Sequence, residues 1–336
     1  MCFFMRAIVH EAKNGFEGLK VQEVEKPRLG DKDVIVKVHT AGMNRRDIAV
    51  VTKRHKAEDP ALIPGSDAAG VIEAVGESVT KFQTGEEVVI NPGLGWQEKS
   101  DAPPKGFEIV GLPDHGTFGE YYKCTEDHVE KKPSHLNFEE AGVLSLAALT
   151  AYRALVTRGQ VKAGETVMLP GIGSGVLTFA LKFAKAKGAR VIVTSRSDEK
   201  LKEALSLGAD RAINTNSNWN EELLDETVDL LIESIGEATF EKSLHIIRKG
   251  GTIVTFGATT NDEVKINIRE FFYGQYNLLG TTMGSAEEFR EMLSFLEEHK
   301  IKPQLDQLFK LEEYREAFEY LQETKNFGKI GFKLQD

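Results

Sequence analysis

The chain has 336 residues, of which 41% are hydrophobic and 28% are charged, and its formal net charge at pH 7 is −10. This length allows two domains with ordinary cores, and this composition excludes a disordered or fibrous protein. The acidic balance excludes a general nucleic-acid binder, because such a protein presents a basic face to the phosphate backbone.

The two cysteines, Cys2 and Cys124, are too few for a disulfide framework or for a zinc site built from four thiolates. The N-terminus is apolar for only a few residues, which is shorter than a signal peptide requires. The longest apolar stretch, residues 141–152, is shorter than a membrane-spanning helix. We therefore expect a cytoplasmic protein that has no membrane partner.

The first 130 residues are rich in β-branched side chains, and turns with Pro and Gly separate the runs. Strands are predicted at residues 7–9, 19–21, 33–38, 70–75, 87–90 and 119–124. This pattern favours a partly open β barrel over a parallel sheet. The long loop at residues 91–119 is expected to cover a site, and its Trp96 either lines a pocket or packs as an aromatic plug.

A helical pattern at residues 138–156 leads into residues 165–200, which predict a strand, a glycine turn, a helix and a second strand. Such a βαβ unit is the context of a dinucleotide-binding fingerprint. Its turn contains Gly171, Gly173 and Gly175. The helix begins near Ser174, and the free N–H groups of its first turn, which includes Val176, point at a pyrophosphate. Leu177 departs from the fingerprint, because a small residue is usual there. The alternative is a glycine turn that binds nothing.

The second strand of this unit ends at Ser195, and Arg196 and Lys200 follow it. An NAD-binding protein usually has an acidic residue here for the ribose 2′-hydroxyl, whereas a guanidinium suits the 2′-phosphate of NADP. The prediction is NADP(H). In the alternative, Arg196 is a solvated surface charge and Asp198 reaches the ribose of NAD.

The remaining chain alternates strands and helices, which predicts a Rossmann-type, doubly wound parallel sheet. The expected strands are residues 211–213, 228–232, 251–256 and 277–281, and the expected helices are 201–207 and 240–247. Two helices at 286–299 and 311–322 then precede a last strand at 330–334, which is expected to rejoin the barrel. The fold class is therefore α/β.

Five motifs, in this order along the chain, resemble the medium-chain dehydrogenase/reductase superfamily: AGMNRRD at 41–47, PGSDAAGVIEAVGESV at 64–79, GTFGEY at 116–121, LTAYRAL at 149–155 and NFGKI at 326–330. The resemblance implies a GroES-like domain at residues 1–146, completed by 283–336, and a Rossmann domain at 147–282. It also implies a homodimer that pairs through the edge strand at 277–284.

Zinc alcohol dehydrogenases of this superfamily have a cysteine at the position of Asn44 and a histidine at that of Ser66. Because an amide and a hydroxyl are poor zinc ligands, we expect no metal. The resemblance then points to the zinc-independent quinone oxidoreductase branch, and to NADPH-dependent reduction of small quinones or α,β-unsaturated carbonyls. Alternatives are a 2-enoyl thioester reductase, a zinc alcohol dehydrogenase and a non-catalytic NADPH-binding sensor.

Three polar residues are the catalytic candidates. Asn44 can donate a hydrogen bond to a developing oxyanion, or it caps the following helix. Asp47 is expected to fix the local backbone. His55 can donate a proton, or it is an exposed residue of a charged loop.

Four further residues are assigned to the cofactor only by the resemblance. It places Arg45 near the cofactor phosphates and Thr150 near the nicotinamide. It also implies that Gly257 lets the backbone approach the ribose and that Lys329 pairs with the pyrophosphate.

Overall fold

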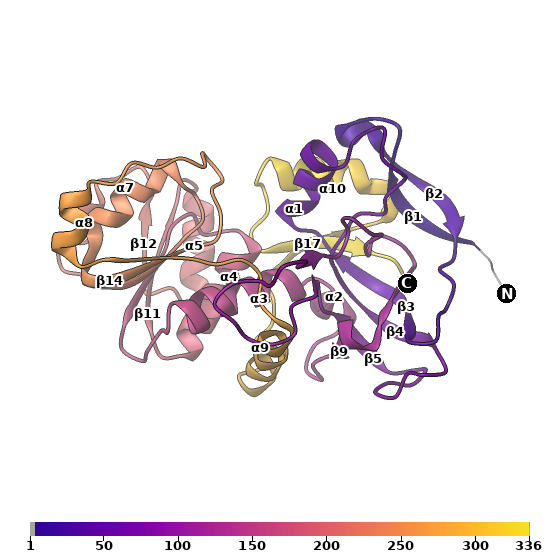
Figure 1. Cartoon of the computed structure of the whole chain (residues 1–336). Helices are drawn as coiled ribbons and strands as arrows, with labels where there is room; N and C mark the ends of the chain where they lie inside the picture. The colour runs from indigo at the N-terminus through magenta and orange to yellow at the C-terminus, as the bar shows by residue number, and fades with distance from the viewer. Residues whose placement is uncertain (1–3, 336) are drawn as a thin grey trace. The chain divides into compact units, whose positions relative to one another are not determined.

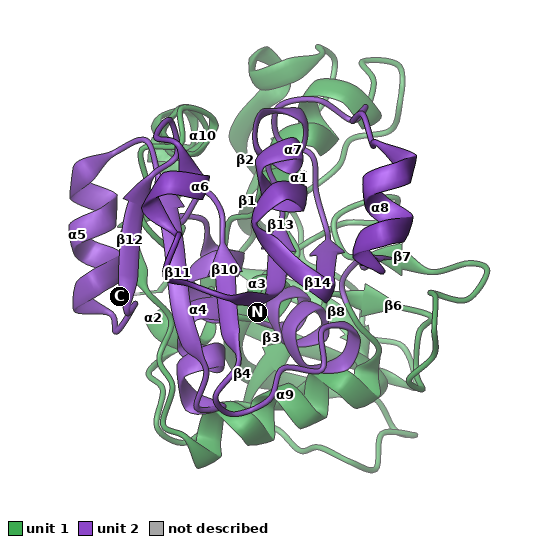
Figure 2. Cartoon of the chain, turned by 90° about the vertical axis from the view of Figure 1, so that its left-hand side faces the viewer, with its two compact units in different colours: residues 1–147, 284–336 green, residues 148–283 purple. Residues whose placement is uncertain are grey.

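A computed structural model describes residues 4–335, so Cys2 and the first residues of the N-terminal stretch lie outside the described chain. The chain divides into two compact units (Figure 2). Unit 1 comprises residues 1–147 and 284–336, and unit 2 comprises residues 148–283.

Unit 1 is built on a sheet with the strand order β16-β17-β3-β4-β5-β9, in which β8 also pairs with β3. Its strands are β3 (Asp33–Gly42), β4 (Asp67–Val75), β5 (Glu87–Ile90), β8 (Tyr121–Thr125), β9 (Val129–Lys131), β16 (Leu305–Phe309) and β17 (Lys329–Lys333). Two smaller pairs are β1 (Phe4–His10) with β2 (Leu19–Glu25) and β6 (Gly93–Leu94) with β7 (Glu108–Ile109). The pairs within the large sheet are antiparallel except β16 with β17.

The alternation of apolar residues along β3 and β4 buries one face of this sheet. The last strand, β17, pairs with the end of β3, and Gly331 lies opposite Gly42 (Figure 1). A side chain on Gly331 would come within 2.5 Å of the Ala41 carbonyl oxygen, so a glycine is needed for this close pairing. The C-terminal strand therefore rejoins the first part of the chain, as the sequence predicts.

The helical segments of unit 1 are mostly short. They are η1 (Gly15–Gly18), α1 (Arg45–Ala49), the π-helical turn η2 (Val50–Arg54), η3 (Glu126–His128), α2 (Phe138–Ala141), α9 (Ala286–Glu298), η5 (Leu311–Glu313) and α10 (Tyr314–Gln322). The helix α3 (Ser145–Tyr152) contains the boundary between the units, and the π-helical turn η4 (Arg153–Arg158) follows it.

Unit 2 contains a parallel sheet of six strands in the order β12-β11-β10-β13-β14-β15. The strands are β10 (Thr166–Leu169), β11 (Arg190–Ser195), β12 (Arg211–Asn214), β13 (Val228–Glu233), β14 (Ile247–Thr255) and β15 (Asn277–Gly280). Between them run α4 (Gly175–Ala186), α5 (Asp198–Ser206), α6 (Trp219–Glu222), α7 (Glu237–Ile246) and α8 (Ile268–Gly274). The order reverses next to β10, which is the switch point of a doubly wound sheet. The prediction of an α/β fold with a doubly wound parallel sheet is confirmed.

The sequence patterns do not predict several short elements, among them β9, β16, α6 and α8. The loop at residues 91–119 contains the small β6–β7 pair, and Trp96 is buried against Phe107 with its indole N–H donating to Ser100 Oγ at 2.9 Å. Trp96 is thus the aromatic plug of that loop. Among the described residues, no helix is long and apolar enough to cross a membrane.

Candidate functional site

Asn44 lies where strand β3 has ended and helix α1 begins. It occupies the N-cap position of α1, and the Asp47 carboxylate accepts a hydrogen bond from the Asn44 backbone N–H at 2.7 Å. This short return contact is one half of a capping box and fixes the backbone around Asn44. The structural role proposed for Asp47 from the sequence is consistent with this contact.

The side-chain amide of Asn44 belongs to a buried polar network in unit 1. Its Oδ1 accepts a hydrogen bond from Lys329 Nζ at 2.5 Å, and its Nδ2 donates to Asp67 Oδ2 at 2.9 Å. Lys329 Nζ also lies 3.2 Å from Asp67 Oδ2 and 2.6 Å from the Met43 carbonyl oxygen. The other carboxylate oxygen of Asp67 accepts from the Leu146 backbone N–H at 2.8 Å. Residues from β4 and β17 thus contact this amide, and α3 contacts the Asp67 carboxylate.

Burial makes these contacts strong. The exposed fractions are 7% for Asn44, 0% for Asp67 and 3% for Lys329. An ammonium has three N–H donors, and here all three have acceptors. A contact of Lys329 with a pyrophosphate would therefore require one of these hydrogen bonds to break. The resemblance alone assigned Lys329 to the cofactor, and the structure places it beside Asn44.

Asp67 is a site residue that the sequence patterns did not single out. The available signal was an acidic residue at the start of an apolar, glycine-containing strand pattern at 67–75, directly after Ser66. Such a carboxylate is buried only when partners compensate its charge. Those partners come from residues up to 262 positions away in the sequence, so local spacing could not reveal them.

Asp47 itself is fully buried, and its Oδ1 is left without a hydrogen-bond partner among the described residues. Burial raises the pKa of the Asp47 carboxyl to about 6, although the nearby Arg46 guanidinium and the Asn44 N–H oppose that rise. Arg46 Nη1 lies 4.0 Å from Asp47 Oδ1 and donates to the Val110 carbonyl oxygen at 2.6 Å. Asp47 therefore titrates close to neutral pH in the folded chain.

The residues at the two positions of the zinc ligands do not suit zinc. Asn44 is a neutral amide, and the buried Ser66 hydroxyl has no hydrogen-bond partner within the described chain. The Lys329 ammonium already pairs with the Asp67 carboxylate beside the Asn44 amide, and it would repel a second cation. Across residues 4–335, no three His, Cys, Asp or Glu side chains gather in a way that could hold a metal ion.

His55 is buried rather than exposed, so the charged-loop interpretation of this side chain is wrong. Only 4% of it is exposed, because its ring packs against His10 with the two Nδ1 atoms 2.7 Å apart. Its Nε2 lies 2.8 Å from the Pro60 carbonyl oxygen, and His10 Nε2 lies 2.9 Å from that of Gly15. Within the described residues no hydrogen bond joins His55 to the Asn44 network.

The glycine turn of unit 2 has the backbone that a phosphate site needs. Gly171 and Gly173 have φ angles of +78° and +129°, which residues with a Cβ rarely adopt. Ser174 caps α4, and its side chain accepts from the Leu177 N–H at 3.2 Å. Gly175 and Val176 form the first turn of this 12-residue helix, whose positive dipole end favours an anion. The turn fits the pyrophosphate of a dinucleotide.

One basic side chain lies close to this turn. Lys200 approaches Gly173 so closely that a Cβ on the glycine would meet Lys200 Cδ at 3.0 Å and Nζ at 3.3 Å. Ser195 is buried at the end of β11, with its hydroxyl accepting from the Ser197 N–H at 3.1 Å. Arg196 is exposed, and no hydrogen bond or ion pair is recorded for it within residues 4–335.

Three other predicted cofactor residues have different surroundings. Thr150 is buried on α3, and Arg45 is exposed at the start of α1. Gly257 follows β14, and a Cβ there would touch nothing closer than Ser234 O at 3.5 Å. The packing of unit 2 therefore does not demand a glycine at this position, and space remains beside its backbone.

Glu233, at the end of β13, is a second buried acid that the sequence patterns missed. Its Oε1 accepts from the backbone N–H groups of Ser234 and Ile235 at 2.9 and 2.7 Å, and the hydroxyls of Thr239 and Ser243 donate to the same carboxylate. These bonds fix the loop between β13 and α7. Ile235 of that loop covers Gly171, where an added Cβ would come within 2.5 Å of Ile235 Cδ1.

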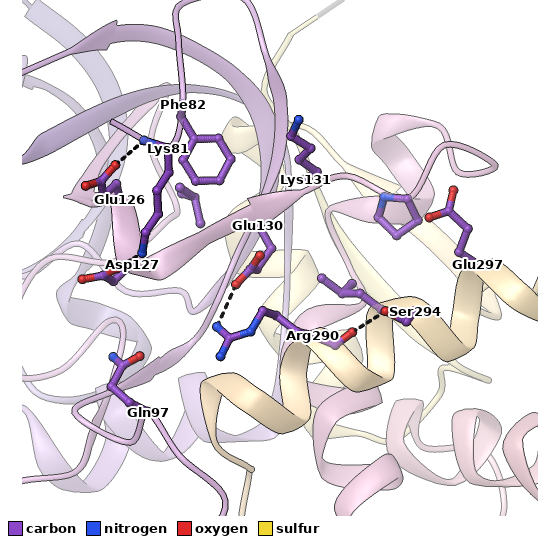
Figure 3. Close-up of a pocket in the computed structure, with 13 residues that line it drawn as sticks. Lys81, Phe82, Gln97, Glu126, Asp127, Glu130, Lys131, Arg290, Ser294 and Glu297 are labelled. Atoms are coloured by element: carbon purple, nitrogen blue, oxygen red, sulfur yellow. Dashed lines mark hydrogen bonds and ion pairs between the residues drawn. The ribbon is translucent and has the colours of Figure 1, made fainter. Parts of the chain in front are cut away.

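A pocket of unit 1 lies between α9 and the region around β9 (Figure 3). Its charged side chains are largely paired: Arg290 with Glu130 at 3.2 Å, and Lys81 with Asp127. None of the predicted site residues lines it. We assign the candidate site to Asn44 and to the glycine turn, because those places have the buried donors and the anion-binding backbone.

Comparisons with known proteins agree with this architecture. Residues 30–134 match the model of the alcohol dehydrogenase GroES-like domain, and residues 175–298 match that of the zinc-binding dehydrogenase family. A zinc-type alcohol dehydrogenase-like protein of Schizosaccharomyces pombe is 34% identical over 98% of this chain and 99% of its own. Human quinone oxidoreductase is 28% identical over 94% of this chain and 93% of its own.

A solved structure described as an NAD-dependent alcohol dehydrogenase aligns with a TM-score of 0.92 and 35% identity, covering 98% of this chain and 100% of that one. The identity, the coverage and the two domain matches all agree with the motifs found in the sequence. The chain therefore belongs to the medium-chain dehydrogenase/reductase superfamily.

Proposed function

We propose that this protein is an NADPH-dependent reductase of quinones or α,β-unsaturated carbonyl compounds that works without a metal. The observation that carries the proposal is the Asn44 amide, buried and bonded to a carboxylate and an ammonium where zinc relatives are expected to place metal ligands. The similarity to quinone oxidoreductase over nearly the whole chain supports the same class of acceptor.

The acceptor oxygen gains negative charge when the conjugated system is reduced, and this charge must be stabilised. The Asn44 Nδ2 group has two N–H bonds, and one of them is taken by Asp67. The second has no partner within the described residues and is available for the substrate oxygen. A donor fixed before the reaction stabilises an oxyanion without reorganisation at the moment of reaction.

NADPH bound at the glycine turn would supply the hydride for this reaction. In the proposal, the N–H groups at the start of α4 bind its pyrophosphate, while Arg196 and Lys200 bind the 2′-phosphate. Arg196 is exposed and lacks a partner among the residues that the structure describes, and Lys200 approaches Gly173; both observations support NADP over NAD. Arg45, Thr150 and Gly257 remain proposed cofactor contacts.

The proposal is tested by measuring NADPH consumption with a panel of quinones, enones, enals and enoyl thioesters, using protein treated with a chelator. We expect turnover that survives chelation, and a fall in kcat of about a hundredfold in Asn44→Ala with little change in the Kd for NADPH. Asn137→Ala is the matched control, since that asparagine caps α2 in the same unit. It should leave kcat unchanged.

Three outcomes would contradict the proposal in different ways. Preference for enoyl thioesters would make the chain an enoyl thioester reductase, and alcohol oxidation sustained by bound zinc would make it a zinc dehydrogenase. Binding of NADPH without any accelerated oxidation would favour a sensor.

We also propose that the protein acts as a homodimer in the cytoplasm. The edge strand β15 and the exposed apolar side chains of the adjoining helix α8 support self-association: Ile268 is 67% exposed, Phe272 49% and Tyr273 66%. A total of two cysteines suits a reducing compartment.

A further inference from the structure

We infer that Asp67 and Lys329 are positioning residues that fix the Asn44 amide as a hydrogen-bond donor toward the acceptor. This inference rests on the proposed function of Asn44 and deepens it. It also gives Lys329 a role that differs from binding the cofactor pyrophosphate.

The chemistry of the partners determines which way the amide points. An ammonium can only donate, so the Asn44 atom 2.5 Å from Lys329 Nζ must be the oxygen. A carboxylate that is ionised can only accept, so the atom 2.9 Å from Asp67 Oδ2 must be the nitrogen. A rotated amide would place the NH₂ group against the ammonium and the oxygen against the carboxylate. Both contacts would then be repulsive, so only one orientation is compatible with its neighbours.

The charges also change the strength of the donor. Lys329 withdraws electron density through the amide oxygen, and this polarisation makes the Nδ2 hydrogens more positive. Asp67 uses one of these hydrogens, and its own charge is balanced by Lys329 and by the Leu146 N–H. The network therefore presents the second N–H as a fixed and polarised donor.

The fold holds both partners rigidly. Asp67 is the first residue of β4, which pairs with the end of β3 at Gly42, and Lys329 begins β17, which pairs with the same end of β3. The Lys329 backbone N–H also donates to the Gln304 carbonyl oxygen at 2.7 Å. The two strands that flank β3 thus bring a negative and a positive group to opposite atoms of one amide.

The test is a double-mutant cycle that combines Lys329→Met with Asn44→Ala. Methionine keeps the length of the side chain and removes its charge. We expect Lys329→Met to lower kcat about ten- to a hundredfold with the Kd for NADPH unchanged. Because Lys329 acts through Asn44, the double variant should be no slower than Asn44→Ala.

Lys333→Met is the matched control. Lys333 lies on the same strand, is exposed and lies 3.5 Å from Glu139 in a surface ion pair. It should leave kcat within a factor of about two of wild type. If the losses in kcat of the two single variants multiply in the double variant, the inference is wrong. A weaker NADPH affinity in Lys329→Met would also overturn it, since that result would place Lys329 at the pyrophosphate.

A second measurement needs no turnover and separates this inference from the proposed function. In ¹⁵N-labelled protein, the Asn44 side-chain NH₂ signals are identified by their loss in Asn44→Ala. Wild type should show slow rotation and slow hydrogen exchange of this group, and Lys329→Met and Asp67→Asn should each accelerate both. Fast exchange in wild type, or rates that neither variant alters, would show that the amide is not fixed, whatever the enzyme reduces.

Discussion

Asp47 shows how burial changes the chemistry of a single side chain. Its carboxylate accepts the Asn44 N–H that begins α1, yet one of its oxygens has no partner in the described chain. Ionisation of a fully buried carboxyl is costly, and a partial ion pair with Arg46 does not offset that cost. The residue that holds the Asn44 backbone is thus also a source of pH dependence.

We predict that Asp47→Asn makes the free energy of unfolding less dependent on pH. Burial raises the pKa of Asp47 from 3.8 to about 6, so the folded chain retains a proton that the unfolded chain has lost. This contribution to stability is fully present below pH 3.8 and disappears as pH rises through about 6. It amounts to roughly 3 kcal/mol.

Urea unfolding measured between pH 4 and pH 7 checks this prediction. The difference in stability between Asp47→Asn and wild type should move in favour of the variant as pH rises. The exposed Asp262 is the control position, and Asp262→Asn should follow the wild-type curve. Parallel curves for Asp47→Asn and wild type would show that Asp47 does not titrate in this range.

The side chain of Arg196 is the basis of the second prediction for a single residue. Its guanidinium is exposed and has no hydrogen bond or ion pair within residues 4–335. In the proposal it binds a 2′-phosphate, and it would gain little from a 2′-hydroxyl. We expect Arg196→Ala to raise the KM for NADPH about tenfold and to leave the KM for NADH nearly unchanged. Lys202→Ala, an exposed lysine on α5, is the control. An equal loss with both coenzymes would refute the assignment of NADP.

Among the elements, the strand β17 has the largest consequence for the site. It comes from the end of the chain, yet it pairs with β3 and carries Lys329 to Asn44. The pairing is tight, because Gly331 faces the Ala41 carbonyl oxygen with no room for a side chain. The geometry of the Asn44 network therefore depends on how closely two distant strands approach.

We predict that Gly331→Ala destabilises the protein by about 1–3 kcal/mol, because the added methyl group forces β17 away from β3. Chemical denaturation gives the free energy of unfolding, and kcat reports the disturbance of the site. Gly93→Ala is a matched control, since Gly93 also lies in a strand but its Cβ position meets nothing closer than 3.5 Å. Equal stabilities of the two variants would show that the contact is relaxed at little cost.

At the scale of the whole molecule, the exposed edge of the unit 2 sheet is the feature that bears on assembly. Within the described part of the chain, the strand β15 has a neighbour on one side only, and α8 presents apolar side chains to solvent. Unpaired strand edges beside an apolar surface associate readily. Pairing of two copies through this region would satisfy both features.

We expect wild-type protein to sediment as a dimer and Tyr273→Glu to shift it toward the monomer, measured by analytical ultracentrifugation over a range of concentrations. A charge buried in an apolar interface is costly, which is the reason for the shift. Leu224→Glu is the control, because Leu224 is 84% exposed elsewhere in unit 2. A monomeric wild type, or equal behaviour of both variants, would reject α8 as part of the interface.

The sequence by itself determined the α/β fold class, because a βαβ unit with Gly171 and Gly173 and the alternation of strands and helices are local patterns of spacing. It also indicated the superfamily, through the resemblance of five motifs along the chain. The sequence patterns did not predict the short elements β9, β16 and α8, because each contains too few residues to show a periodic pattern. Only the tertiary structure decided that Asp67 and Lys329 meet at Asn44 and that His55 is buried against His10. The partners in these contacts are 23, 285 and 45 residues apart. The Asp67 and Lys329 charges are stable in the interior only because the folded sheet brings them together.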